Sequence, residues 1–141
     1  ETEVLEVTSR EERDEGIGRV ADLKTPMTLK ELCWLVKDKF HLGAVKVFGD
    51  MDQKIKRPAI SPGAGKSMIK AALDKKADVL ITGDIDHHTG IDAVAQGLAV
   101  IDAGHYGIEH IFIEDVRIYL EEKLPGIEAA AAPVCHPFQI V

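Results

Sequence analysis

A histidine and a glutamate, His105 and Glu109, lie four residues apart at the start of a pattern typical of a helix. One helical turn rises about 5.4 Å, so side chains at positions i and i+4 lie above one another on the same face. An imidazole and a carboxylate placed in this way can bind the same divalent cation. The pair also has a plain structural interpretation, because a carboxylate in the first turn is favoured by the positive end of the helix dipole.

A second polar group, Gly83-Asp-Ile-Asp-His-His88, follows an apolar run that predicts a buried strand. Two carboxylates and two histidines are an unusual density for a loop without a function. His88 and Asp84 are the candidate catalytic residues, since an imidazole acts as a general acid or base near neutral pH. Either one could instead complete a metal site, which usually takes at least three protein ligands. We interpret His87 as a helix cap or a solvent-exposed side chain.

The third candidate is the glycine-rich stretch 61–67, which reads Ser-Pro-Gly-Ala-Gly-Lys-Ser. Its end matches the phosphate-binding loop of nucleoside triphosphatases, but Ile60 stands where that motif requires its first glycine, so we reject this function. Glycines before a helix can still form a site for an anionic substrate. A tight turn between strand and helix explains them equally well. The residues that could bind the anion are Gly63, Gly65, Lys66 and Ser67.

Strands and helices that alternate along the chain would position these loops. Apolar runs at 77–82 and 98–102 predict buried strands, and Thr28-Leu-Lys-Glu31 predicts a capped helix start. The order predicts an α/β fold with a mainly parallel sheet and helices on both faces. Because the carboxyl ends of parallel strands gather the functional loops, the three loops should meet at one edge.

Other segments allow more than one interpretation. Residues 44–48 and 55–60 predict strands that form either a hairpin or neighbours in the sheet, and 106–123 predicts one long helix. Residues 127–134 and 138–141 could supply one or two last strands. Residues 1–15 form either an N-terminal strand or the remnant of a preceding or inserted domain, and 16–141 form one α/β domain.

Composition limits the partners. The chain has 141 residues, 45% of them hydrophobic, which is enough for one domain with a core. Its net charge of -7 argues against a nucleic acid or an anionic membrane as the main partner. Two distant cysteines in no metal-like spacing, and no apolar run long enough to cross a bilayer, lead us to expect a cytoplasmic protein.

Several motifs, in this order, resemble those of the NIF-three-like proteins of the YbgI and YqfO type, which are also named GTP cyclohydrolase I type 2. They are Gly16-Ile-Gly-Arg-Val20, Pro26-Met-Thr-Leu29, Pro62-Gly-Ala-Gly65, Ala77-Asp-Val-Leu-Ile-Thr-Gly-Asp84, Ile101-Asp-Ala-Gly-His105 with Glu109, and Pro137-Phe138. The resemblance covers residues 16–141 and only the C-terminal half of such a protein.

The resemblance implies two divalent metal ions between two α/β halves, in subunits that form a ring-shaped homohexamer. Two family ligands match His105 and Glu109, and the others belong to an N-terminal half that this chain lacks. His88 matches a histidine beside the metals, a candidate proton donor. The resemblance does not indicate whether the metal is zinc, iron, manganese or magnesium.

Two functions fit this resemblance. The first is a metal-dependent hydrolase, like a GTP cyclohydrolase I type 2, that acts on a phosphorylated or nucleotide-like substrate. The second is a regulatory or scaffold protein that binds metal without turnover. We expect the 141-residue chain to be inactive as an enzyme by itself.

Overall fold

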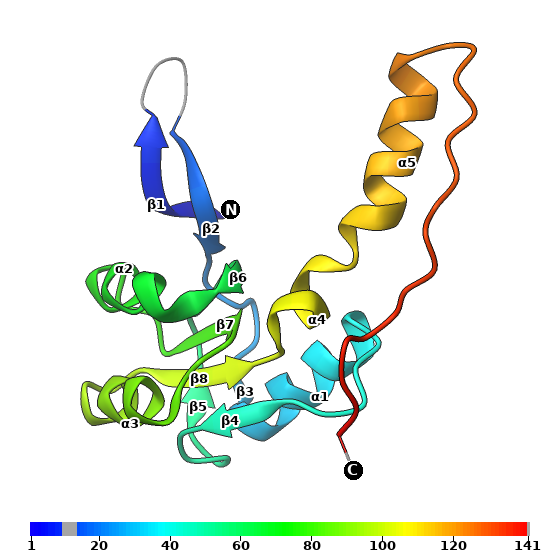
Figure 1. The fold of residues 1–141 in the computed structure, drawn as a ribbon. Coiled ribbons are helices and arrows are strands. Elements are labelled where there is room, and N and C mark those ends of the chain that lie inside the picture. The colour runs from blue at the N-terminus through cyan, green and yellow to red at the C-terminus, as the bar shows by residue number, and fades with distance from the viewer. Residues whose placement is uncertain (10–13, 141) are drawn as a thin grey trace.

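The computed structural model describes residues 1–9 and 14–140 and has a mixed sheet with helices on both faces (Figure 1). The three central strands β6, β7 and β8 run parallel, and the outer strands pair antiparallel to their neighbours. The strands, in their order across the sheet, are β1 (Glu3–Ser9), β2 (Glu15–Val20), β6 (Pro58–Ala64), β7 (Val79–Gly83), β8 (Ala99–Asp102) and β4 (Lys46–Phe48). A small second sheet pairs β3 (Met27–Thr28) with β5 (Lys54–Ile55).

The helices cover both faces of the sheet, as predicted. The helices on one face are α1 (Leu29–Lys39) and α4 (His105–Glu109). Those on the other face are η1 (Gly65–Met68), α2 (Ile69–Asp74) and α3 (His87–Ala95). The last helix, α5 (Phe112–Lys123), extends away from the sheet, and the chain returns beside it toward the C-terminus (Figure 1).

Strand β7 begins with three consecutive apolar residues, Val79 to Ile81, because both faces of the sheet are covered here. Successive side chains of a strand point to opposite faces of the sheet. Val79 and Ile81 pack in the cluster under α1, while Leu80 packs in the cluster under α2 and α3. Because both faces are covered, every position of β7 is buried.

The predicted start of α1 is confirmed as a capping box. The Thr28 hydroxyl accepts a hydrogen bond from the backbone N–H of Glu31 at 3.1 Å, and the Glu31 carboxylate accepts one from the backbone N–H of Thr28 at 2.7 Å. These bonds, from the Thr28 backbone and then its hydroxyl, hold the pKa of Glu31 below its ordinary value. The reciprocal bonds satisfy two backbone donors that the first turn leaves without partners.

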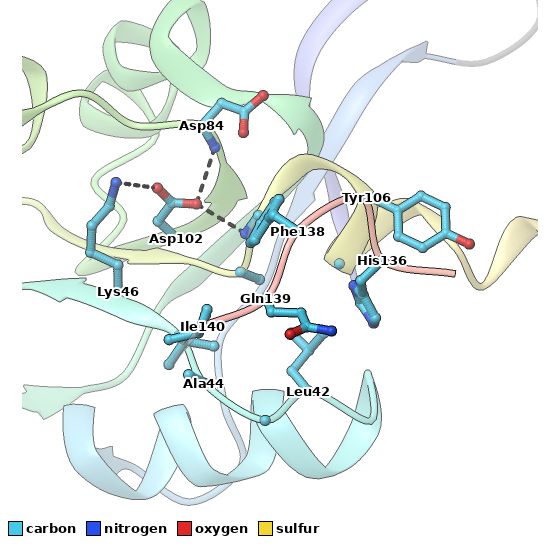
Figure 2. Close-up of a pocket in the computed structure, with 15 residues that line it drawn as sticks. Leu42, Ala44, Lys46, Asp84, Asp102, Tyr106, His136, Phe138, Gln139 and Ile140 are labelled. Carbon is cyan, nitrogen blue, oxygen red and sulfur yellow. Dashed lines mark hydrogen bonds and ion pairs between the residues drawn. The ribbon is translucent and has the colours of Figure 1, made fainter. Parts of the chain in front are cut away.

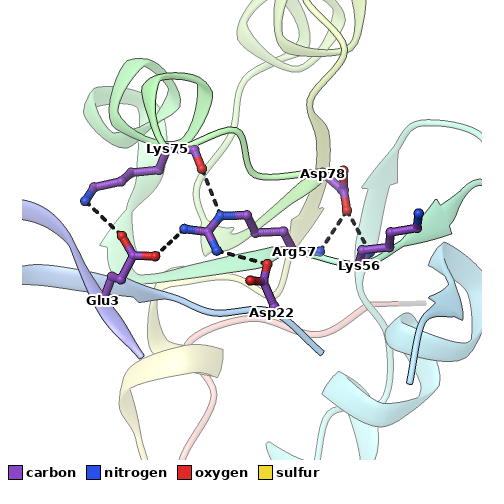
Figure 3. Close-up of polar contacts among 6 residues, drawn as sticks. All are labelled: Glu3, Asp22, Lys56, Arg57, Lys75 and Asp78. Carbon is purple, nitrogen blue, oxygen red and sulfur yellow. Dashed lines mark hydrogen bonds and ion pairs between the residues drawn. The ribbon is translucent and has the colours of Figure 1, made fainter. Parts of the chain in front are cut away.

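The β1–β2 hairpin is attached to the α/β body by the pairing of β2 with β6, by the buried side chains of Leu5 and Val20, and by one charged cluster. Leu5 of β1 is buried in the same cluster as the inner face of α2. Figure 3 shows Arg57 at the centre of the charged cluster, donating to Asp22 and to the backbone carbonyl of Lys75, both at 2.9 Å, and pairing with Glu3. The hydrogen bond from Arg57 is the main reason why the pKa of Glu3 lies below its ordinary value.

The interpretation of residues 44–48 and 55–60 as a hairpin or neighbouring strands is wrong. Strand β4 pairs antiparallel with β8 at one edge of the sheet, whereas β6 lies between β2 and β7. The Asp78 carboxylate accepts the backbone N–H groups of Lys56 and Arg57, which bends the chain between β5 and β6. Pro58 then opens β6, at a position where a missing donor is tolerated.

The predicted helix over 106–123 is two helices, α4 and α5, separated at His110 and Ile111. The Nδ1 atom of His110 lies 3.0 Å from the backbone oxygen of Gly107 and bonds to it. In a continuous helix that oxygen would accept from the N–H of Ile111, so the buried imidazole competes with the helix ladder. Residues 124–140 form no strand, and Val141 lies outside the described residues.

No helix in the described ranges 1–9 and 14–140 is both long enough and apolar enough to cross a membrane.

Candidate metal centre

The three loops predicted to meet at the carboxyl ends of β6, β7 and β8 do so. Gly83 makes their close approach feasible, because a Cβ atom there would lie 2.5 Å from the backbone nitrogen of His105. Gly65 has a similar role, since its Cβ would lie 2.2 Å from the side chain of Thr82. Glycine at these two positions therefore lets the end of β7 pack against both α4 and the end of β6.

His105 lies between two carboxylates. Its Nε2 atom is 3.2 Å from Oε2 of Glu109, one turn further along α4. Its Nδ1 atom forms a hydrogen bond of 3.0 Å with Oδ2 of Asp84, which follows β7. All three side chains are partly exposed, so a ligand from solvent or from another part of a protein can reach them.

Nε2 of His105 and the Glu109 carboxylate form an ion-pair contact whose spacing is also compatible with two ligands of one divalent cation. Two atoms that each bind a metal at about 2 Å lie about 3 Å apart, as these two atoms do. Gly63 borders the pair, because a Cβ atom on it would lie 3.0 Å from Oε1 of Glu109 and 3.5 Å from Nε2 of His105. Within residues 1–9 and 14–140, no group of three metal-binding side chains is assembled.

The buried carboxylate of Asp102 joins the loops that carry the pair (Figure 2). It accepts the backbone N–H groups of Asp84, Ile85 and Gly104, each at 3.0 Å. The Lys46 ammonium from β4 lies 2.9 Å from the same carboxylate and also donates to the backbone oxygen of Ile85. One charged group thus holds the β7–α3 loop, the β8–α4 loop and the edge strand β4 in register.

Asp86 caps the helix that carries His88. Its carboxylate accepts the backbone N–H of Thr89 at 2.9 Å and the Thr89 hydroxyl at 2.7 Å. Lys66 lies 3.2 Å from the same carboxylate and so links the glycine-rich stretch to α3. These contacts, with the two from Thr89 largest, hold the pKa of Asp86 well below its ordinary value.

The structure brings some predicted residues together and leaves others apart. Asp84, His105, Glu109 and Gly63 lie together. His88 is exposed in the first turn of α3 with its ring next to that of His87, and no hydrogen bond or ion pair joins it to the His105 pair within the described residues. The residues of the glycine-rich stretch that lie apart from the pair are Gly65, packed on Thr82, and the exposed Lys66 and Ser67.

A pocket of about 780 Å³ lies next to this centre and borders Asp84 (Figure 2). It is lined by residues 42–46, by parts of 102–107 and by parts of 136–140. Both polar and apolar side chains line the pocket, and Phe138 and Ile140 are among the apolar ones. The volume is in the range of pockets that bind small organic ligands.

Sequence reasoning missed Asp102 and Lys46. Asp102 was visible as a carboxylate at the end of an otherwise apolar strand, directly before the Ala-Gly break. That position is a usable signal, because a buried carboxylate must find several donors. Lys46 carried no comparable signal, since its role depends on the pairing of β4 with β8.

Comparisons with known proteins agree with this architecture. A family model described as Duf34/NIF3 (NGG1p interacting factor 3) matches residues 1–136. A Bacillus subtilis protein named GTP cyclohydrolase 1 type 2 homolog is 45% identical over 103 residues, which is 73% of this chain and 27% of that protein. A protein of the same name from Clostridium acetobutylicum is 38% identical over 123 residues, 87% of this chain and 44% of that protein.

A solved structure, of a Bacillus cereus protein related to NIF3, superposes with a TM-score of 0.81 at 32% identity. The matched region is 89% of this chain and 36% of the Bacillus cereus chain. The chain therefore spans less than half the length of each of these three relatives.

We predict that Gly63→Ala weakens zinc binding at His105 about tenfold, because the added Cβ displaces the Glu109 carboxylate. Zinc affinity is measured from NMR shifts of His105 on addition of zinc. The matched control is Gly97→Ala: both glycines have a positive φ, +67° and +88°, but a Cβ at Gly97 meets no atom within 4 Å. Both variants lose about 1–2 kcal/mol of stability through backbone strain. Equal zinc affinities in the two variants would contradict the prediction.

We predict that Asp86→Ala lowers the thermal unfolding midpoint at neutral pH, because it removes the cap of α3. The folded pKa of Asp86 is depressed, so its contribution to stability is present above the ordinary carboxyl pKa of about 4 and is lost as the pH falls below it. The two unfolding midpoints should therefore converge in acid. Asp92→Ala, at an exposed position of the same helix, is the control and should leave the midpoint almost unchanged. A constant difference at all pH values would show that the carboxylate charge has no part in the effect.

Proposed function

This chain belongs to the Duf34/NIF3 family, and from this premise we propose that it carries part of a divalent-metal site in a metal-dependent hydrolase. One observation carries the proposal: Nε2 of His105 and Oε2 of Glu109 lie 3.2 Å apart and face the space that Gly63 leaves free. The proposed cation is divalent, because imidazole and carboxylate together suit such ions.

We propose that the other ligands come from the half of the protein that the relatives have and this chain does not contain. The complete site would hold two cations between the halves, in a ring-shaped homohexamer. Two features support this proposal: the pair is partly exposed, and the chain spans 27% and 44% of two curated relatives. Two protein ligands alone would leave most coordination positions to water.

The proposed substrate is phosphorylated or nucleotide-like, in line with the relatives named GTP cyclohydrolase 1 type 2 homolog. A bound divalent ion supplies a Lewis acid and an activated water. In this proposal His105 and Glu109 hold the ion, His88 exchanges a proton with the substrate, and Lys66 and Ser67 contact its anionic part. The pocket that borders Asp84 is large enough for a substrate of nucleotide size, but none of these five residues lines it.

The alternative function is a metal-binding regulatory or scaffold protein without turnover. A specific observation favours it: within the described residues, His88 makes no hydrogen bond or ion pair with the His105 pair. Exposed apolar side chains on α5 also offer a surface for contact with another protein; they are Phe112, Val116, Ile118 and Tyr119. A site without a proton donor binds metal but lacks one element of a hydrolase.

We predict that His105→Ala abolishes zinc binding by this chain at the pair, and that Glu109→Gln weakens it, with little loss of fold because both side chains are partly exposed. Zinc is added to the chain and followed by NMR shifts of the α4 residues. His87→Ala, which changes another exposed histidine, is the control and should bind zinc like the unchanged chain. Unchanged zinc binding by His105→Ala would overturn the assignment of the pair as ligands.

A second prediction separates the enzyme from the regulator. In a protein that contains both halves, purified with manganese, we expect hydrolysis of GTP or of a nucleotide phosphate ester, detected as product by mass spectrometry. His88→Ala should lower kcat by about 10²-fold or more with unchanged metal content, and His87→Ala should not. If bound manganese produces no turnover of these substrates, the regulatory function is the one that remains.

A further inference from the structure

We propose that Asp84 is a positioning residue for the imidazole of His105, and that its carboxylate fixes the tautomer with the proton on Nδ1 and a bare Nε2. The inference rests on the proposed metal-binding function and assigns a role to a residue beside the ligands. It replaces the two roles expected for Asp84 from its sequence, a catalytic acid or base and a third metal ligand.

Each ring nitrogen of His105 faces a different carboxylate. The Nδ1 atom and Oδ2 of Asp84 form a hydrogen bond of 3.0 Å, and a carboxylate can only accept. The Nε2 atom and Oε2 of Glu109 lie 3.2 Å apart, at the spacing of two ligands of one cation. When a cation occupies Nε2, the ring proton must lie on Nδ1, where the Asp84 carboxylate accepts it.

The same geometry excludes Asp84 as a third ligand of that cation. The two nitrogens of an imidazole point away from each other, so a cation on Nε2 lies on the opposite side of the ring from Asp84. Consistent with this, no three metal-binding side chains converge in the part of the chain that the structure describes. A histidine that binds metal through one nitrogen typically donates its other N–H to a carboxylate, which orients the ring and strengthens the ligand.

The backbone of Asp84 is held for this role. Its φ is +53°, in the left-handed region that residues other than glycine seldom adopt. Its backbone N–H donates to the buried carboxylate of Asp102 at 3.0 Å, and that carboxylate also accepts the N–H of Gly104, just before His105. Asp102 thus fixes the main chain on both sides of the hydrogen bond between Asp84 and His105, independently of the Asp84 side chain.

Position 84 allows a clean experiment, because the side chain can be changed without adding backbone strain. Asp84→Gly removes the acceptor and tolerates the positive φ, and Asp84→Asn keeps an acceptor oxygen and is also suited to this region. Lys76→Gly is the matched control: Lys76 is exposed, has a φ of +55° and is placed in the turn after α2.

The tautomer of His105 is read from the ring nitrogen shifts of the metal-free, ¹⁵N-labelled chain, at a pH high enough that these shifts no longer change with pH. We expect the proton on Nδ1 in the unchanged chain, in Asp84→Asn and in Lys76→Gly. In Asp84→Gly we expect a shift toward the Nε2-protonated form. Zinc affinity should fall about 10–100-fold in Asp84→Gly and by less in Asp84→Asn.

Two results would overturn the inference: a proton on Nε2 in the unchanged chain, or the same tautomer in Asp84→Gly as in the unchanged chain. A fall in zinc affinity without a change of tautomer falls under the second result. Failure of the proposed function is a separate outcome, since it would appear as no response of His105 to zinc in the unchanged chain, whatever its tautomer.

Discussion

The candidate metal centre depends on one buried carboxylate, that of Asp102, which pairs with the exposed ammonium of Lys46. A carboxylate removed from water is costly unless its oxygens accept several hydrogen bonds, and Asp102 accepts three from backbone N–H groups besides its contact with Lys46. Those three donors belong to two different loops. The requirement to satisfy this charge therefore fixes the loops after β7 and β8 relative to each other, and with them the place of Asp84 beside His105.

Much of the fold and part of the site were readable from local patterns. The buried strands β7 and β8, the capping box of α1 and the spacing of His105 and Glu109 each depend on a few consecutive residues. The family follows from the motifs for the same reason, and the match over residues 1–136 confirms that resemblance. The meeting of the three loops was also predictable, because the topology of parallel strands dictates it.

What the sequence left open depends on contacts between distant segments. The partner of β4 is β8, about 50 residues further along, and no local pattern specifies that pairing. The glycine-rich stretch illustrates a second limit. Its composition suits either an anion site or close packing, and only the neighbours of each missing Cβ distinguish them: Thr82 at Gly65, and Glu109 at Gly63. The break at His110 is a third case, since it arises from an imidazole that competes for a backbone oxygen.

The attachment of β4 also has a kinetic meaning. Pairs such as Lys46 and Asp102 join segments far apart in the chain, and contacts of this kind form late because closing a long loop costs entropy first. Until β4 docks, the carboxylate of Asp102 lacks its cation, and the two loops have no charged anchor on that edge. His105 and Glu109 would then be present on a short helix before their surroundings are complete. Because α4 alone sets the spacing of the pair, completion of the sheet decides only when the carboxylate that places Asp84 beside His105 gains its cation.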